Sequence, residues 1–242
     1  MTILTFNTWG TRGPTARWPV LLQALQSLNP DILCLQEVTN TDLIHSLSYP
    51  TCFHAQLGGL ALLSRFPALA HREVTYQTVS PLEPYGRQAL LAKLQWGSTP
   101  LWIVTTHLAW QAMDEPTRLG QVEELLELLE PLEGRVLLSG DLNAVPESAP
   151  IQRILSAGFR DLFALTHPGE TGITWDNQNP FIQSHSVRFP DRRIDYLFLH
   201  EKVLKTLTPI EVQVVCQTPT PEGLYPSDHY GVLASLRRSQ RP

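Results

Sequence analysis

A short apolar run, rich in Ile, Leu and Val, recurs along the chain and ends each time in polar residues that can do chemistry. Continuous apolar runs of this length are typical of buried β-strands. The late part of the chain adds segments that alternate or run apolar as strands do. The predicted strands are residues 3–6, 31–35, 101–105, 135–140, 193–199, 210–215 and 230–236. A chain with this pattern is constrained to build its core around β-sheet.

Helical patterns lie between these strands. Residues 19–28 and 116–129 carry apolar residues at helical spacing. Asp114 is available as the N-cap of the second helix, and Ser148 is predicted to cap a third helix that runs to Leu155. Helices alternate with strands early, and strands dominate late. The sequence therefore predicts an α/β fold in which helices cover a mixed-sheet sandwich.

The size and composition of the chain fit one large α/β domain. It has 242 residues, of which 43% are hydrophobic and 17% charged, and this composition is typical of a globular protein. No linker-like shift in composition and no internal repeat divides the chain. We therefore expect a single domain over residues 1–242, acting as a monomer.

Charge and cysteine content limit the partners and the compartment. The net charge of -5 does not favour a polyanion, so any phosphate recognition must be local. The three cysteines lie far apart, with neither zinc-type spacing nor a disulfide framework. No segment approaches the roughly 18 apolar residues that span a bilayer, and the first residues lack the basic region of a signal peptide. We expect a cytoplasmic protein without stable membrane insertion.

Asp141 and Asn143 follow a predicted strand and lie two residues apart, so their side chains point to the same side. An Asp in this position can accept a proton from an attacking water, and the Asn amide can hold that water or a phosphoryl oxygen. The alternative is ordinary turn chemistry, because both residue types are common in turns. These two residues alone do not decide between the interpretations.

Glu37 follows the apolar run 32–35, where a carboxylate is poorly solvated unless it meets a cation. Mg²⁺ prefers oxygen ligands and uses one or two carboxylates, so Glu37 is a candidate ligand. The alternative for Glu37 is an acid at the N-terminus of a helix in the following loop. Asn7, at the end of the first predicted strand, offers a neutral oxygen to the same site.

Asp228 and His229 precede the last predicted strand, and an imidazole is suited to phosphate chemistry near neutral pH. Because adjacent residues do not orient each other, His229 needs a separate acceptor. Asp195 is a candidate, since an Asp among apolar strand residues needs a partner. An ion pair with Arg192 or Arg193 is the alternative for Asp195.

His107 also stands at a strand end, a position in which many histidines are simply hydrogen-bonded core residues. Other histidines and the cysteines have no chemical neighbours in the sequence and receive no role. These residues are His45, His54, His71, His200, Cys34, Cys52 and Cys216.

Taken in chain order, the polar groups form a specific pattern from Asn7 to His229. Asn, Gln-Glu, Thr-x-His, Gly-Asp-x-Asn, Arg-Ile-Asp-Tyr and Ser-Asp-His each stand at the end of an apolar strand. This order resembles the endonuclease/exonuclease/phosphatase superfamily. The resemblance implies a four-layered α/β/β/α sandwich with two mixed, mainly antiparallel sheets packed face to face and helices outside.

The same resemblance implies a divalent-metal-dependent hydrolase of phosphate esters. By position, Glu37 would bind Mg²⁺ or Mn²⁺, with Asn7 and Asp228 nearby in the metal shell. The resemblance places these residues at one mouth of the sandwich.

The remaining residues receive catalytic roles from the resemblance. Asp141 would activate the attacking water, and Asn143 would orient it against the phosphorus. His229, held by Asp195, would stabilise charge on the phosphoryl oxygens, and His107 would contact the same phosphate. These roles agree with the chemistry of the side chains themselves.

Two groups of motifs favour different substrates. Trp9 stands where nuclease-like members carry Asp, and its surroundings resemble the neutral sphingomyelinase type. The segments around Arg87 and Trp175 are similar to the tyrosyl-DNA phosphodiesterase type. We expect a phosphodiesterase that acts on a nucleic-acid end such as a 5'-phosphotyrosyl linkage, because Trp175 and Arg87 would stack on and grip a terminal nucleotide.

A lipid or small-molecule phosphodiester is the alternative substrate. A lipid enzyme should expose an apolar patch near the mouth of the site, and Trp9 and Trp110 are the residues to inspect. A non-catalytic binding module with the same fold is a third hypothesis, and loss of Asp141 or His229 would be its simplest sign. Both residues are present.

Overall fold

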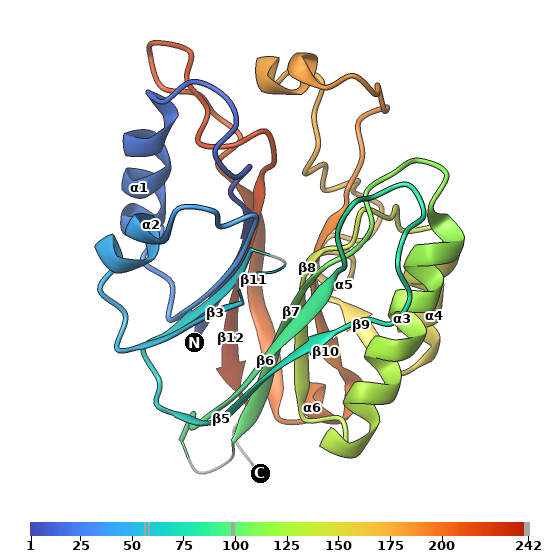
Figure 1. The fold of residues 1–242 in the computed structure, drawn as a ribbon. Coiled ribbons are helices and arrows are strands. Elements are labelled where there is room, and N and C mark those ends of the chain that lie inside the picture. Colours follow the sequence, from blue (N-terminus) through green and yellow to red (C-terminus); the bar gives the residue numbers. More distant parts are fainter. Residues whose placement is uncertain (56, 58, 98–99, 240–242) are drawn as a thin grey trace.

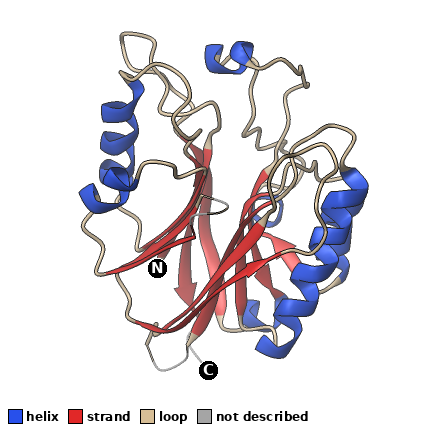
Figure 2. Cartoon of the chain, viewed as in Figure 1, coloured by secondary structure: helices blue, strands red, loops and turns tan. Residues whose placement is uncertain are grey.

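The computed structural model describes residues 1–55, 57, 59–97 and 100–239. The chain forms two six-stranded sheets packed face to face, with helices on both outer faces (Figure 2). The predicted α/β/β/α sandwich is therefore confirmed. None of the helices in this described part of the chain is long and apolar enough to cross a membrane.

The first sheet has the N-terminal strand near its centre. Its strands, in spatial order, are β11 (Leu207–Val215), β12 (Gly231–Arg238), β1 (Thr2–Asn7), β2 (Ile32–Gln36), β4 (Leu60–Ser64) and β3 (Thr51–Ala55). Strands β1 and β2 are parallel, and the other neighbours are antiparallel. The parallel register brings Asn7 beside Gln36, so both strands end in polar residues at one edge of the sandwich.

The second sheet repeats this arrangement with one parallel pair, β7 and β8. Its strands, in spatial order, are β5 (Ala68–Thr75), β6 (Gln88–Leu94), β7 (Leu101–His107), β8 (Val136–Asp141), β10 (Asp195–His200) and β9 (Phe159–Asp161). The parallel pair ends in His107 and Asp141, which are register partners.

Helices α1 and α2 lie against the first sheet, and α3 and α4 lie against the second (Figure 1). The helices are α1 (Arg17–Leu28), α2 (Thr41–Ser46), α3 (Glu115–Leu129), α4 (Ala149–Ser156), α5 (Leu162–Thr166) and α6 (Glu201–Leu204), with short 3-10 turns η1 (Glu130–Leu132) and η2 (Pro180–Ser184). The three long predicted helices correspond to α1, α3 and α4.

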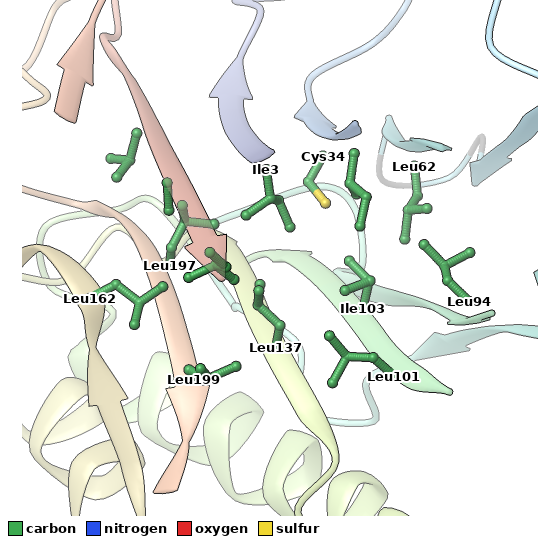
Figure 3. Packing of buried hydrophobic residues seen from close by; sticks show 14 of the residues in the cluster. Ile3, Cys34, Leu62, Leu94, Leu101, Ile103, Leu137, Leu162, Leu197 and Leu199 are labelled. Carbon is green, nitrogen blue, oxygen red and sulfur yellow. The ribbon is translucent and has the colours of Figure 1, made fainter. Parts of the chain in front are cut away.

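Most of the core lies in three apolar layers. One fills the space between the sheets, where Ile3 and Cys34 of the first sheet lie near Ile103, Leu137 and Leu197 of the second (Figure 3). The other two layers join α1 and α2 to the first sheet and α3 and α4 to the second. Removal of this apolar surface from water supplies most of the driving force for folding.

The structure differs from the sequence predictions in the helix caps. Asp114 and Ser148 occupy the N-cap positions of α3 and α4, but neither side chain makes a capping hydrogen bond. Asp114 instead accepts hydrogen bonds from the hydroxyls of Ser80 and Thr117, and Ser148 donates to the carbonyl of Val145. The carboxylate of Asp114 therefore joins the 76–87 loop to α3.

Strands β3, β4, β5, β6 and β9 have no counterpart among the predicted strands. Strands β4 and β6 are buried but consist mainly of Leu and Ala, which favour helix when taken alone. Strand β5 is largely exposed, and β9 has only three residues. Tertiary pairing rather than local preference specifies these strands.

Gly140 permits the close approach of β8 and β7 directly before Asp141. Its φ is +139°, and a Cβ at this position would collide with the carbonyl oxygen of Thr106 on β7. A side chain at this position would therefore force apart the two strands that carry His107 and Asp141.

We predict that Gly140→Ala lowers the free energy of unfolding by about 1–3 kcal/mol, because the added methyl group clashes with Thr106 and the backbone conformation is strained for Ala. Gly169→Ala is the control: Gly169 also has a positive φ, +87°, but a Cβ added to it would meet no atom within 4 Å. Denaturant unfolding of both variants measures the difference. Equal destabilisation would show that the Thr106 contact does not matter.

Candidate active site

Strand register collects three polar side chains on neighbouring strands of the second sheet. His107 on β7 pairs with Asp141 on β8, which pairs with Asp195 on β10. All three side chains are at least nine-tenths buried. The end of β1 on the facing sheet adds Asn7, so the site forms where both sheets meet.

Asp141 lies at the centre of this group and is 1% exposed. Its Oδ2 accepts a hydrogen bond from Asn7 Nδ2 at 2.9 Å, and its Oδ1 accepts one from the backbone N–H of Asn143 at 2.9 Å. Burial, followed by the nearby carboxylate of Asp195, raises the pKa of Asp141. A carboxylate held in this way is a better proton acceptor than one in water.

His229 lies between two carboxylates. Its Nδ1 is 3.0 Å from Asp195 Oδ2, and its Nε2 is 3.8 Å from Asp141 Oδ2. Burial alone would lower the pKa of His229, but the carboxylates of Asp195, Asp141 and Asp228 outweigh it and raise this pKa to about 10. The imidazole is therefore a cation at neutral pH.

The alternative partners of Asp195 are engaged elsewhere. Arg193 forms a buried ion pair with Asp161 on β9 and donates from Nε to the carbonyl of Thr171. Arg192 packs against the ring of Trp175. Asp195 therefore has the contact with His229 that the sequence predicted.

His107 is the second imidazole of the site, with Nε2 3.4 Å from Asp141 Oδ2. Burial, then the positive charges of Arg87 and His229, hold its pKa well below the ordinary value. His107 is therefore neutral at physiological pH and differs from His229 in charge. Asn143, whose Nδ2 donates to the carbonyl of Leu108 at 3.2 Å, lies beside them.

Glu37 directly follows β2 and presents a partly exposed carboxylate at the edge of the site, with 23% of its side chain accessible. Its Oε1 accepts a hydrogen bond from Asn7 Nδ2 at 3.3 Å, and its Oε2 lies 3.4 Å from the exposed Arg12. The backbone of Glu37 is left-handed, with φ +56°. This conformation aims the carboxylate toward Asn7 instead of continuing the strand.

Asp228 is buried and hydrogen-bonded on both oxygens. Its Oδ2 is 2.8 Å from His185 Nε2, and its Oδ1 accepts a hydrogen bond from the Ser227 hydroxyl at 3.2 Å. The Ser227 hydroxyl is also 2.7 Å from the carbonyl of Asn7, which joins this loop to the end of β1. His185 had no predicted role, because no apolar run or motif surrounds it in the sequence.

One group of three metal-ligating residues in the described part of the chain has its ligand atoms within 4.8 Å of one another: Asp141, Asp195 and His229. The Nδ1 of His229 is already engaged by Asp195 at 3.0 Å. The imidazole of His229 therefore occupies the space between the two carboxylates, hydrogen-bonded to Asp195 and 3.8 Å from Asp141.

Arg17 is a second residue that the sequence did not reveal. It is fully buried and donates hydrogen bonds to the carbonyls of Thr8 at 2.9 Å and of Pro226 at 3.0 Å, besides other carbonyls in the loop after β1. These contacts hold the loop after β1 against the loop that carries Asp228. In the sequence, Arg17 is only an ordinary first residue of a helix.

A cleft of about 1130 Å³ opens above these residues and is lined by Glu37, Asp141 and His229. Arg87 and Trp175 also line it, as expected for substrate-binding residues. Both are buried, however, and engaged with the protein: the guanidinium of Arg87 lies 2.7 Å from the carboxylate of Glu83.

The ring of Trp175 meets His229 edge-on, with centroids 4.9 Å apart. Trp9 is 3% exposed and stacks on Phe181, with ring centroids 5.0 Å apart. Trp110 is only half-buried and lines the cleft. Trp9 therefore belongs to the wall of the site and offers no exposed apolar anchor.

The comparisons with known proteins agree with this geometry. A model of the Endonuclease/Exonuclease/phosphatase family matches residues 4–229, and the chain belongs to this family. The site is accordingly that of a phosphoesterase, in a family whose enzymes generally depend on a divalent metal. Protein angel of Drosophila melanogaster is 31% identical over 156 residues, which is 54% of this chain and 44% of the length of that protein.

Solved structures share the fold over nearly the whole chain. TDP2 of D. rerio, complexed with single strand DNA product, has a TM-score of 0.80 at 21% identity and covers 98% of both chains. Truncated TDP2 of Caenorhabditis elegans has a TM-score of 0.78 at 21% identity, covering 97% of this chain and 96% of that one. A mannosyl-6-phosphatase of Bacteroides thetaiotaomicron has a TM-score of 0.76 at 15% identity, covering 98% of this chain and 99% of that one.

We predict that Asp195→Asn lowers kcat for a chromogenic phosphodiester by about 10- to 100-fold, because the neutral amide no longer stabilises positive charge on the imidazole of His229. Metal affinity, measured by calorimetry, should stay unchanged. Asp161→Asn is the matched control, since it removes a buried carboxylate paired with Arg193 and should reduce stability but not kcat. A loss of metal affinity in Asp195→Asn would contradict the assignment.

Proposed function

We propose that this protein is a phosphodiesterase that uses Mg²⁺ or Mn²⁺ and hydrolyses its substrate by in-line attack of water. The observation that carries this proposal is that a buried carboxylate, Asp141, lies 3.8 Å from a charged imidazole, His229, in the lining of one cleft. Such a pair supplies a proton acceptor for the nucleophile and positive charge for the phosphoryl oxygens.

Each side chain then has a separate task. Asp141 accepts the proton of the attacking water, and Asn143 holds that water in line with the phosphorus. His229, kept in orientation by Asp195, donates a hydrogen bond to a phosphoryl oxygen. His107 is neutral and provides a further N–H for the same phosphate.

The residues at the edge of the cleft suit a hard divalent cation. Glu37, Asn7 and Asp228 each offer an oxygen ligand, and among the described residues the ion pair of Glu37 is with the exposed Arg12. These three residues would hold the ion. When bound, the ion neutralises charge on the phosphoryl oxygens.

A nucleic-acid end such as a 5'-phosphotyrosyl linkage is the preferred substrate. The fold relative TDP2 of D. rerio was crystallised with single strand DNA product, which supports this choice. Arg87 and Trp175 line the cleft beside the reaction centre and would contact the leaving group or the terminal nucleotide.

A lipid phosphodiester is the second candidate. Leu57 and Tyr85 line the cleft and are 60% and 43% exposed, so its mouth carries apolar side chains. Parallel assays with 5'-phosphotyrosyl DNA and sphingomyelin distinguish the nucleic-acid substrate from the lipid substrate.

A non-catalytic binding module is disfavoured, because the acid, amide and imidazole groups that the reaction needs are all assembled.

We predict that excess chelator abolishes hydrolysis and that Glu37→Gln weakens Mg²⁺ or Mn²⁺ affinity by about tenfold or more, because one anionic ligand is lost while the shape of the side chain is kept. Titration calorimetry and thermal unfolding measure affinity and stability separately. Glu170→Gln, an exposed change outside the cleft, should alter neither. Undiminished turnover in chelator would refute metal dependence.

A further inference from the structure

The cleft has a wall formed by the loop of residues 176–191, which includes η2 (Figure 1, orange segment at the top). Backbone hydrogen bonds of 2.9 and 3.0 Å between Trp175 and Arg192 close the neck of this loop. Within it, Asn177 Nδ2 donates to Asp191 at 2.7 Å and to the carbonyl of Phe189 at 2.9 Å. Contacts within the loop therefore hold it together. Because Arg192 forms part of the neck, its backbone position is fixed relative to Trp175.

The guanidinium of Arg192 is held by aromatic rings. Its Cζ lies 3.6 Å from the ring centroid of Phe189 and 5.5 Å from that of Trp175. All three side chains line the cleft. The rings stabilise the positive charge of the guanidinium, but they do not provide the strong hydrogen-bond acceptors that an anion would offer to its N–H groups.

Among the described residues, no acidic side chain forms an ion pair with Arg192. No carboxylate oxygen of the described residues lies within 4.0 Å of its guanidinium, and its buried Nε has no hydrogen-bond acceptor. The other two arginines that line the cleft are neutralised: Arg12 lies 3.4 Å from Glu37, and Arg87 lies 2.7 Å from Glu83. A half-buried guanidinium whose Nε has no acceptor among the described residues is costly unless a ligand satisfies it.

Arg192 is connected to the reaction centre through the side chain of Trp175. The indole of Trp175 contacts His229 edge-on at 4.9 Å and also packs against Arg192. Two hydrogen-bond donors therefore flank one aromatic ring: the imidazole of His229 beside Asp141, and the guanidinium of Arg192, whose Nε has no acceptor among the described residues. An aromatic surface between two such groups suits a nucleotide unit with a phosphate on either side.

We propose that Arg192, held between Phe189 and Trp175, binds a second phosphate of the substrate next to the one that is cleaved. The preferred substrate class is then a nucleotide chain with at least one internal phosphate, rather than an isolated diester. This proposal rests on the proposed function and narrows its substrate.

Two matched substrates test this proposal. Both are 5'-nitrophenyl phosphate esters of a thymidine dinucleotide, but one has a phosphodiester between the nucleosides and the other a neutral methylphosphonate. The wild-type protein should prefer the charged substrate in kcat/KM by about tenfold or more, as expected for a hydrogen bond between charged groups. In Arg192→Met this ratio should fall close to one.

Two further variants serve as controls. Arg188→Met removes the same charge from the outside of the same loop, where Arg188 donates to the carbonyls of Ile182 and Gln183, and should keep the wild-type ratio. Arg192→Lys retains a positive charge without the planar fork and should keep part of the preference. An unchanged ratio in Arg192→Met, or no preference in the wild type, would overturn the proposal.

Failure of the proposed function gives a different result. In that case the wild-type protein cleaves neither substrate, and calorimetry with the two 5'-phosphorylated dinucleotides replaces the rate measurement. The same preference for the charged form, lost in Arg192→Met, is expected for their dissociation constants. Equal binding of both forms by the wild type would count against Arg192 regardless of catalysis.

Discussion

The arrangement of the site depends on the hydrogen bond between Asn7 and Asp141, which joins the ends of the two sheets at 2.9 Å. A buried carboxylate without partners would be strongly unfavourable, so Asp141 requires donors from both halves of the sandwich. Beside it, Gln36 Nε2 donates to the hydroxyl of Thr105 at 3.0 Å, again from one sheet to the other. These polar contacts fix the relative position of the sheets where apolar packing alone would permit sliding.

The loops around this contact adopt conformations that are unfavourable for isolated residues. Trp9, Glu37 and Asn143 all have positive φ, at 62°, 56° and 50°. Such conformations cost about 1–3 kcal/mol each and persist only where surrounding contacts enforce them. The hydrogen bond of Arg17 to the carbonyl of Trp9 supports the first conformation, and that of Asp141 to the backbone N–H of Asn143 supports the last. Stability is thus given up at the site in return for a fixed geometry.

Most of the fold and much of the site could be predicted because their signals are local. Asp141, Glu37 and His107 each stand at the end of a continuous apolar strand, and these strand ends of the two sheets meet at one mouth of the sandwich. The strand ends bring together all of the acids, amides and imidazoles that the sequence predicted for the site. Their chemical roles follow from side-chain chemistry and family membership and remain predictions.

The rest could not be predicted, because it depends on contacts between residues distant in the sequence. Arg17 reaches the carbonyl of Pro226, 209 residues away, and His185 reaches Asp228 from an irregular loop. The sequence also does not reveal that Arg87 is paired with Glu83, while Arg192 has no such partner in the part of the chain that the structure describes. Charge balance within a cleft is a property of the folded chain alone.

The central claim is that Asp141 activates the nucleophile, and single-turnover hydrolysis by Asp141→Asn tests it most directly. The amide keeps the shape of the side chain but cannot accept a proton, so the rate of the chemical step should fall by about 10²-fold to 10⁴-fold. Substrate binding should be retained or become tighter, since a negative charge facing phosphate is removed. Near-normal single-turnover rates in this variant, with the wild-type dependence on metal, would contradict the account.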